Sequence, residues 1–386
     1  MHTVRARKVL VLKRMVLAIL TGVFLFVYAL LIFFYFVQWN KLPEYKPSQT
    51  HSVFVSVVIA ARNEEETLPL LLKDLLQQSY PQQMFEVIVV DDYSTDGTAT
   101  VIKTLGGDNL RMVLPDAAPE ASSKKTAIAT GIKKATGELM VITDADCRVG
   151  KNWLKTMASF YKQHDAAFIA APVAFTHDNS FLQIFQVLDF MTLQGITGAS
   201  VGAGFHAMCN GANLAYTKAA FETVDGFAGI DEVATGDDML LMQKIWKAHP
   251  KGVFYLKGRE AVVRSEPMKT WKDFLMQRRR WASKTLVYDD YRIVLVLGFV
   301  LLLNALPFAL FVAAFFNKVY WFTLVIFFLT KTVIEWPFVS SVAAFFGQQN
   351  LMRYFFFVQP LHVFYTVFVG LFSQVGKYEW KGRRTR

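Results

Sequence analysis

The feature that most limits how this chain can fold is a set of long apolar segments near its two ends. Residues 15 to 37 contain no charged side chain, and a helix of about 20 apolar residues is long enough to cross a bilayer. Three further segments near the other end have the same character: Ile293 to Phe316, Tyr320 to Phe346 and Tyr354 to Phe372. We therefore predict one membrane-spanning helix before the middle of the chain and three after it.

Five basic residues precede the first apolar segment: Arg5, Arg7, Lys8, Lys13 and Arg14. A secretory signal peptide also begins with basic residues, but its apolar region is shorter and a small-residue cleavage site follows it. This segment therefore fits a retained membrane anchor better. Basic residues ahead of a span favour a cytosolic N-terminus, which would place the next part of the chain on the opposite side of the membrane.

The third predicted span contains two ionisable residues and a proline: Lys331, Glu335 and Pro337. Residues four apart lie on the same face of a helix, so the lysine and the glutamate can neutralise each other. Ionisable groups inside a bilayer often have a function. A functional pair and a structural pair at a proline kink are equal alternatives here.

The composition fits a soluble domain joined to a membrane domain. Of the 386 residues, 53% are hydrophobic and 19% are charged, which is too apolar for an ordinary soluble enzyme. The two cysteines, Cys147 and Cys209, cannot form a disulfide framework, and the chain has no Asn-x-Ser/Thr glycosylation site. The net charge of +10 suggests anionic lipids or phosphate ligands. No basic, aromatic-rich repeat of a nucleic-acid module occurs, so we expect no nucleic-acid partner.

Between residues 48 and 291 the pattern changes to short apolar segments separated by charged ones. Short β-branched segments predict buried strands, and apolar residues three or four apart predict helices. The predicted strands are Ser52 to Ala61, Phe85 to Val90, Arg111 to Leu114 and Leu139 to Thr143. The predicted helices are Glu64 to Gln78, Thr98 to Leu105 and Lys124 to Ala135. This alternation predicts an α/β domain with a mostly parallel sheet.

Acidic residues follow two of these strands: Asp91 and Asp92 after one, Asp144 and Asp146 after the other. Ligands of such sheets bind at the carboxyl ends of the strands. Carboxylates gathered at one edge repel one another unless a cation lies between them, and Mg²⁺ or Mn²⁺ prefers such oxygen ligands. A solvated turn with helix-capping side chains at residues 94 to 96 is the alternative for the first pair. The chain has neither a P-loop nor a GxGxxG motif, which argues against the corresponding nucleotide-binding folds.

Six motifs occur in one order along the chain. They are VVIAARNEEE (57 to 66), VIVVDDYSTDGT (87 to 98), KKTAIATGIKKATGELMVITDADC (124 to 147), GANLAYTKAAFETVDGF (211 to 227), TGDDMLL (235 to 241) and QRRRW (277 to 281). This series resembles the inverting glycosyltransferases of family 2, such as cellulose, chitin, hyaluronan and poly-N-acetylglucosamine synthases and ceramide glucosyltransferase. The resemblance covers about residues 52 to 285. It includes the DxD and QxxRW motifs, while Asp237 stands where the family's TED box has glutamate.

The resemblance implies a GT-A fold, a Rossmann-like catalytic domain with a mostly parallel sheet, flanked by transmembrane helices. The implied domains are a basic segment and one span at 1–47, the catalytic domain at 48–291, and three spans with a basic tail at 292–386.

The resemblance also implies which residues bind the nucleotide-sugar donor, most simply a UDP-sugar. The donor-binding candidates are Asn63, Glu64, Asp92, Lys125 and Asp144. Asp92 would hold the uracil or ribose, and Asp144 would reach the ribose or the metal. Asp146 would ligate the Mg²⁺ or Mn²⁺ ion that holds the diphosphate. For Lys125, a place on a solvated helix face is an equal alternative.

On the acceptor side, Asp238 would be the general base that takes the proton of the attacking hydroxyl. One displacement inverts the anomeric centre, so an α-linked donor would give a β-glycoside. The candidates for binding the acceptor or the diphosphate are Asp237, Gln277, Arg280 and Trp281. The planar guanidinium of Arg280 suits phosphate oxygens, and the indole of Trp281 offers a face on which a sugar ring can stack.

Two predicted helices have a second interpretation at the membrane surface. The QRRRW helix can be an interfacial amphipathic helix. Its lipid-facing residues would then be Trp271, Phe274, Leu275 and Trp281. Ser180 to Gln194 has apolar residues at helical spacing and is equally compatible with a core helix and with a helix in the membrane plane.

The expected function is membrane-bound transfer of a sugar from a nucleotide sugar to a growing β-linked polysaccharide. Transfer of a single sugar to a lipid, as in ceramide glucosyltransferase-like enzymes, is the alternative. An inactive membrane scaffold is a third, but the acids that the chemistry needs are all present. Four spans are few for a polymer channel. For a polymer product we therefore also expect partner subunits or a homodimer.

Because nucleotide sugars are made in the cytosol, we expect the catalytic domain at the cytosolic face of a bacterial inner membrane. This conflicts with the basic N-terminus, so either the charge rule fails here or one apolar segment does not cross fully.

Overall fold

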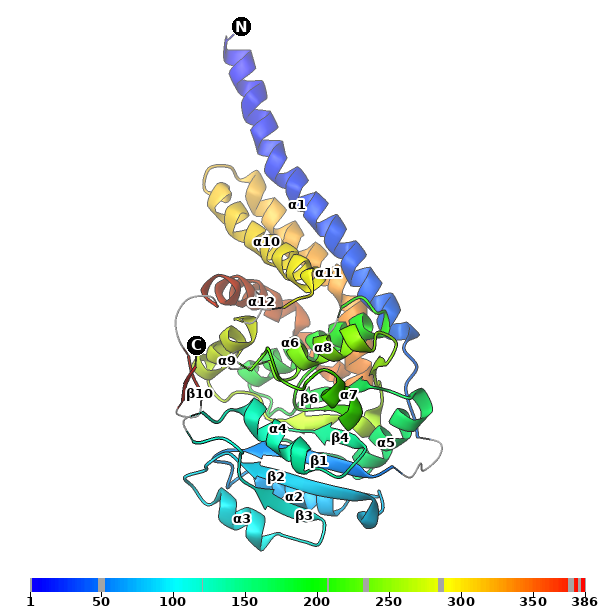
Figure 1. Ribbon diagram of the computed structural model, residues 1–386. Helices are drawn as coiled ribbons and strands as arrows, with labels where there is room; N and C mark the ends of the chain where they lie inside the picture. Colours follow the sequence, from blue (N-terminus) through cyan, green and yellow to red (C-terminus); the bar gives the residue numbers. More distant parts are fainter. Residues whose placement is uncertain are drawn as a thin grey trace.

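The computed structural model of the protein describes residues 2–47, 53–119, 121–206, 208–231, 236–283, 288–373, 378–380 and 383–385 (Figure 1). Side chains are described from Val16 to Ser373 within these ranges. The predictions for the basic side chains at the two ends, for residues 48 to 52 and for Thr235 therefore lie outside the described part of the chain.

All four predicted apolar segments form helices. They are α1 (His2–Lys41), α10 (Tyr291–Ala314), α11 (Val319–Phe346) and α12 (Met352–Phe372). Each is long and apolar enough to cross a membrane, starting at Val16 in α1. Helix α11 packs between α1 and α10, and these three run side by side away from the rest of the molecule (Figure 1). The four predicted apolar segments thus form packed helices, and a membrane domain stays a prediction.

Helix α12 has a different direction from its neighbours. It lies across the direction of α10 and α11 and packs against α9 and α6 (Figure 1). The N-terminal end of α1 lies far from the sheet, at the opposite end of the molecule (Figure 1). Which of these ends faces the cytosol stays a prediction.

The middle of the chain forms the predicted α/β domain around a seven-stranded sheet of order β3-β2-β1-β4-β7-β5-β8. The strands are β1 (Val55–Ala61), β2 (Phe85–Asp91), β3 (Leu110–Val113), β4 (Leu139–Ile142), β5 (Phe168–Ala170), β7 (Leu214–Thr217) and β8 (Val253–Tyr255). Neighbours pair in parallel, except that β7 is antiparallel to both β4 and β5. The mostly parallel sheet is therefore confirmed.

Shorter elements complete the fold. The helices are α2 (Leu68–Leu76), α3 (Thr98–Thr104), α4 (Lys124–Lys134), α5 (Trp153–His164), α6 (Phe181–Gly202), α7 (Lys218–Thr223), α8 (Met239–Ala248) and α9 (Trp271–Ala282). Two further two-stranded sheets join β6 (Val173–Phe175) to β9 (Val263–Ser265) and β10 (Tyr378–Trp380) to β11 (Arg383–Thr385). Short 3-10 helices span Gln82–Met84, Arg259–Ala261 and Gln349–Leu351.

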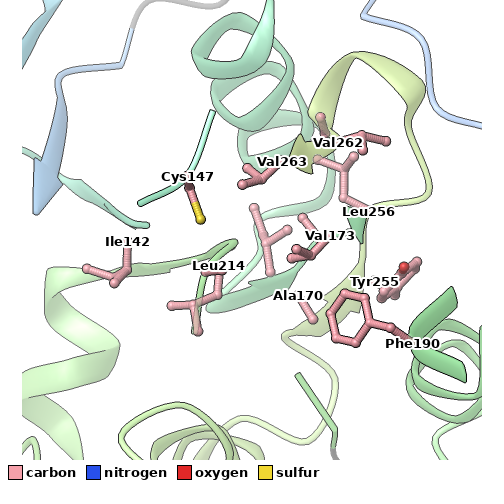
Figure 2. Packing of buried hydrophobic residues seen from close by; sticks show 14 of the residues in the cluster. Ile142, Cys147, Ala170, Val173, Phe190, Leu214, Tyr255, Leu256, Val262 and Val263 are labelled. Carbon is pink, nitrogen blue, oxygen red and sulfur yellow. The ribbon is translucent and has the colours of Figure 1, made fainter. Parts of the chain in front are cut away.

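The centre of the sheet is fully buried, as its β-branched sequence predicts. Residues of the large sheet such as Ile142 and Leu214 pack together with Val173 and Val263 of the β6–β9 sheet (Figure 2). Helix α4 lies directly on the sheet because Gly131 has no β-carbon; one built there would clash with Val58. Strand register places Asp91 opposite Ala61, so the ends of β1 and β2 meet at one edge.

Helix α6 is a buried helix, which decides between its two interpretations. It packs on β6 and β8 on one side and on α1, α11 and α12 on the other. Two glycines permit this close approach: a β-carbon at Gly195 would lie 3.0 Å from Phe338, and one at Gly198 would lie 2.7 Å from Trp39. Helix α6 thus joins the α/β domain to the apolar helices.

Candidate active site

One cavity of about 880 Å³ connects the acidic edge of the sheet with the membrane helices. The predicted site residues that line it are Glu64, Asp92, Asp144, Asp146, Asp237, Asp238, Gln277, Arg280 and Trp281. They come from loops after three strands, from the start of α8 and from α9, so the fold brings together segments that are far apart in sequence. Among the described residues, Asn63 and Lys125 were predicted for the site but lie outside the cavity lining.

Asn63 holds two loops together beside the cavity. Its backbone is left-handed, with φ of 54°, a conformation that asparagine adopts more readily than most residues. The Asn63 side-chain oxygen accepts a hydrogen bond from the backbone of Thr95 (2.8 Å), and the Asn63 backbone donates to the hydroxyl of Ser94 (3.0 Å). The structure therefore gives Asn63 a positioning contact between the loops after β1 and β2.

Asp92 is buried at the wall of the cavity, with 3% of its surface exposed. The Ser122 hydroxyl donates to its Oδ1 atom, and the Arg62 guanidinium donates to its backbone oxygen at 2.6 Å. These contacts fix the loop after β2, so the carboxylate of Asp92 has a defined place beside the other acids.

Lys124 is a site residue that the sequence reasoning missed. Its ammonium donates to Oδ1 of Asp144 at 2.6 Å and lies 3.2 Å from Oδ2 of Asp237. Burial lowers the pKa of Lys124, but the carboxylates of Asp144 and Asp237 outweigh burial and raise it overall. Lys124 therefore stays protonated and joins the DxD segment to the TGDDMLL segment.

The neighbouring Lys125, which was predicted for the site, points elsewhere. Its ammonium donates to the backbone oxygen of Ile230. Successive residues of a helix point about 100° apart, so Lys124 and Lys125 reach different surroundings. Lys125 is buried, so its alternative place on a solvated helix face is wrong. The apolar residues Ile128 and Ile132, which are buried where α4 packs on the sheet, were the available signal for its rotation.

Asp144 and Asp146 follow β4 and both line the cavity. The described residues include no group of three or more acidic, histidine or cysteine side chains able to hold a metal ion. A two-carboxylate set still suits Mg²⁺ or Mn²⁺, because these ions commonly complete their coordination with water and substrate phosphates. The donor set of the DxD segment therefore fits a metal that binds together with a diphosphate.

Asp238 is held rigidly at the start of α8. Its Oδ1 accepts from the backbone of Met239 (2.8 Å) and its Oδ2 accepts from the backbone of Gly211 (3.0 Å). A β-carbon at Gly211 would lie 3.3 Å from the Lys124 ammonium and 3.5 Å from the Asp237 carboxylate. Glycine at this position leaves room for the lysine and both acids to meet at the cavity.

The QRRRW helix, α9, packs into the protein. Phe274 is fully buried between Phe185 and Tyr365, although Trp271 is 40% exposed. Gln277, Arg280 and Trp281 line the cavity. The lipid-facing interpretation is therefore wrong for Phe274, which lies in the interior.

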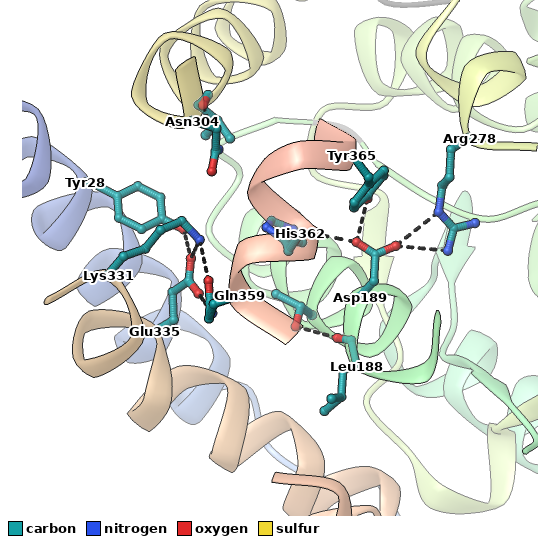
Figure 3. A network of polar contacts seen from close by, with 12 residues as sticks. Tyr28, Leu188, Asp189, Arg278, Asn304, Lys331, Glu335, Gln359, His362 and Tyr365 are labelled. Atoms are coloured by element: carbon teal, nitrogen blue, oxygen red, sulfur yellow. Dashed lines mark hydrogen bonds and ion pairs between the residues drawn. The ribbon is translucent and has the colours of Figure 1, made fainter. Parts of the chain in front are cut away.

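A second residue missed from the sequence is Arg278, the first arginine of QRRRW. Its guanidinium nitrogens lie 2.9 and 3.1 Å from Oδ2 of Asp189 in α6, and both side chains are 3% exposed. Tyr365 of α12 donates to the other oxygen of Asp189 at 2.6 Å (Figure 3). Arg278 also lies over the ring of Trp281, 4.3 Å from its centroid. This buried pair fixes α9 against α6 and α12.

The predicted pair in the third span is confirmed. The Lys331 ammonium lies 2.5 Å from Oε1 of Glu335, and Tyr28 and Gln359 also donate to the glutamate (Figure 3). Lys331 is fully buried. The network joins α1, α11 and α12, and Glu335 and Gln359 also line the cavity.

Comparison with known proteins gives a family match for most of the catalytic domain. Residues 56–224 match the family described as Glycosyl transferase family 2. Glycosyltransferase AglE of Haloferax volcanii is 32% identical over 128 residues, which are 33% of this chain and 41% of that protein. A Bacillus subtilis protein named "Probable glycosyltransferase YdaM" is 24% identical over 253 residues, which are 63% of this chain and 58% of that protein. The chain thus spans about two fifths to three fifths of these relatives.

One solved structure resembles nearly the whole chain. It is the mannosyltransferase PcManGT from Pyrobaculum calidifontis in complex with GDP-Man and Mn²⁺. The TM-score is 0.59 with 20% sequence identity, and the match covers 93% of this chain and 99% of that one. The similarity shows a shared fold.

Proposed function

We propose that this chain, whose residues 56–224 match the family described as Glycosyl transferase family 2, is an inverting glycosyltransferase that moves a sugar from a nucleotide sugar to an acceptor at the membrane. The observation that carries the proposal is the single cavity that joins the acidic edge of the sheet to the membrane helices. Donor and acceptor can meet in it without leaving the protein.

In this proposal the donor is a UDP-sugar. Asp92 binds its uridine, and Asn63 and Glu64 shape the first loop around it. Asp144 and Asp146 hold Mg²⁺ or Mn²⁺, which when bound neutralises the charge that develops on the diphosphate. Lys124 orients Asp144 and keeps its charge balanced in the absence of a ligand.

Asp238 takes the proton of the attacking acceptor hydroxyl. Its two backbone hydrogen bonds hold the carboxylate in one orientation, and each oxygen keeps a lone pair for the proton. The acceptor oxygen attacks C1 opposite the leaving diphosphate, so an α-linked donor gives a β-linked product. Arg280 supplies a cation toward the diphosphate, and Gln277 and Trp281 contact the sugar.

Two acceptors are compatible with this chemistry: a growing β-linked polysaccharide and a single lipid. A polymer channel would need more helices than the four described here, from a partner subunit or from a second copy. We place the enzyme in a bacterial inner membrane with its catalytic domain in the cytosol, where nucleotide sugars are available.

The test is release of UDP by the purified protein in nanodiscs across a panel of UDP-sugars, with Mn²⁺ or Mg²⁺ and with EDTA. We expect turnover of at least one donor that EDTA and Asp146→Asn both abolish. Sizing the radiolabelled product separates a polymer from a single added sugar. Absence of turnover with every donor, by protein that binds no UDP, would refute the proposal.

A further inference from the structure

The cavity continues from the acidic edge into a part that we call the membrane branch. It is lined by α10 between Ile293 and Leu301 and by α12 between Phe355 and Ser373, with contributions from α1 and α11. The α10 side of the branch is almost wholly aliphatic. The α10 wall suits a hydrocarbon chain, while the α12 side also carries the polar side chains of Gln359, His362 and Thr366.

The membrane branch ends inside the helix bundle. In the described part of the chain, α10 lines it only as far as Leu301, although the helix continues to Ala314. Helix α11 lines it only from Glu335 onward, although that helix begins at Val319. The lining therefore comes from the helix halves that lie next to the catalytic domain. Such a branch can hold a ligand but does not lead a polymer across the membrane.

The branch has unfilled space beside Leu297 and Gly298 of α10. Leu297 lines it and is nevertheless 42% exposed. At Gly298, a β-carbon would find no atom within 4 Å. One turn further along, α10 and α12 touch: a β-carbon at Gly370 would lie 2.7 Å from Leu301. This space lies on a helix that is long and apolar enough to cross a membrane, where a lipid chain could reach it.

The charged groups at the branch are neutralised by each other. Arg278 pairs with Asp189, and Lys331 pairs with Glu335 (Figure 3). Neither pair presents an uncompensated charge to a ligand, so the branch does not require an ionic occupant. The polar end of an occupant would instead lie toward Asp238 and Arg280, at the other end of the same cavity.

We propose that the acceptor is a membrane amphiphile whose apolar chain lies in the membrane branch and whose headgroup hydroxyl lies at Asp238. This inference rests on the proposed glycosyl transfer. The headgroup oxygen forms the bond to C1 of the donor sugar, the bond from C1 to the diphosphate breaks with its electron pair on the diphosphate, and Asp238 accepts the hydroxyl proton. The products are a glycolipid and a nucleoside diphosphate, and the glycolipid leaves into the lipid beside Leu297 and Gly298.

The test fills the branch with a side chain. Gly298→Leu adds volume where there is open space, and leucine favours a helix more than glycine does. Gly22→Leu is the matched control, because Gly22 also has open space around it but lies on α1 outside the cavity lining. Both variants are placed in phosphatidylcholine and phosphatidylglycerol nanodiscs, and thermal unfolding and UDP binding confirm that they are folded.

The first readout is transfer of radiolabelled sugar into the lipid fraction. Diacylglycerol supplies a hydroxyl directly, and a polyprenyl-linked sugar supplies one through a saccharide. We expect Gly298→Leu to lower transfer to the accepted lipid by roughly 10-fold or more, because the leucine side chain displaces several methylene groups of the lipid from the apolar wall. We expect Gly22→Leu to leave transfer unchanged. Equal transfer by both variants, or a water-soluble polymer as the product, would overturn the inference.

The second readout needs no turnover and uses a diacylglycerol with a diazirine on its acyl chain. Photolabelling should reach α10 and α12 residues of the membrane branch and should fall in Gly298→Leu but not in Gly22→Leu. Labelling confined to outward residues such as Leu295 and Phe357 would overturn the lipid site. Branch labelling without UDP release from any donor would leave the site in place and refute glycosyl transfer.

Discussion

The ammonium of Lys124 lies 2.6 Å from Oδ1 of Asp144 and so ties the start of α4 to the end of β4. The same nitrogen lies 3.2 Å from Asp237. One cation therefore sets the spacing between the proposed metal-binding acids and the segment that carries the proposed base. This relationship gives the first prediction.

Lys124→Gln should lower the affinity of the enzyme for Mn²⁺, so that UDP release needs a higher Mn²⁺ concentration. Without the ammonium, Asp144 loses the partner that orients it, and loss of such a partner typically costs about 10- to 100-fold in metal affinity or activity. Titration of UDP release with Mn²⁺ measures the effect. Lys133→Gln on the same helix, whose exposed ammonium pairs with Asp116, is the control. An unchanged Mn²⁺ dependence in Lys124→Gln would contradict the positioning role.

Asp238→Asn should lower kcat by about 10²- to 10⁴-fold, the usual contribution of a general base. UDP affinity should persist, because the amide oxygen can still accept one of the two backbone hydrogen bonds. Steady-state kinetics combined with UDP binding separates the two effects. Asp116→Asn, at the exposed surface pair, should match the unmodified protein. A variant at Asp238 with normal kcat would remove this residue from the mechanism.

Asp189→Asn should destabilise the whole protein. It leaves the guanidinium of Arg278 buried without its counter-charge, and breaking such a pair typically costs about 3–5 kcal/mol. The double variant Asp189→Leu with Arg278→Met should recover most of this loss, since it removes both charges. Thermal unfolding in detergent measures all three proteins.

Lys247→Gln provides the comparison with an exposed pair, which contributes less than about 1 kcal/mol. A double variant no more stable than Asp189→Asn would show that the two charges do not act as a pair.

His206 should make stability depend on pH. Burial lowers the pKa of His206 to about 4, while Asp290 raises it slightly and Arg292 lowers it. In the unfolded chain the pKa is near 6.5, so between pH 6.5 and 4 only the unfolded state takes up the proton. Stability from the neutral imidazole is therefore complete above pH 6.5 and is lost as the pH falls toward 4.

His206→Gln removes this titration and can keep a polar contact with Tyr35 and Ser200. The melting temperature of the variant should fall less than that of the unmodified protein between pH 6.5 and 4. Parallel curves for the two proteins would show that His206 does not control this loss.

Much of the fold could be predicted because its signals are local. The strands around Val57, Val89 and Val141 are continuous apolar segments. The acidic residues of the site follow two of these strands within a few positions in the sequence. The choice between Lys124 and Lys125 needed the rotation of α4 on the sheet, which the packing of Ile128 and Ile132 sets. The Arg278–Asp189 pair could not be predicted, since its partners are 89 residues apart on two helices.

The membrane branch could not be predicted from the sequence either. It depends on the space left beside Gly298 and on the contact between Leu301 of α10 and Gly370 of α12. Hydropathy alone carries no information about the distance between two helices. Hydropathy likewise predicted the length of α12 but not its direction across α10 and α11.

The anomeric configuration of the product tests the central claim most directly. Purified product made from an α-linked UDP-sugar is analysed by NMR for the configuration at C1 of the transferred sugar. We expect a β-glycoside from the unmodified protein, and formation of the same β-glycoside about 10²- to 10⁴-fold more slowly by Asp238→Asn. An α-glycoside, or a product without a new glycosidic bond, would contradict single-displacement transfer at this site.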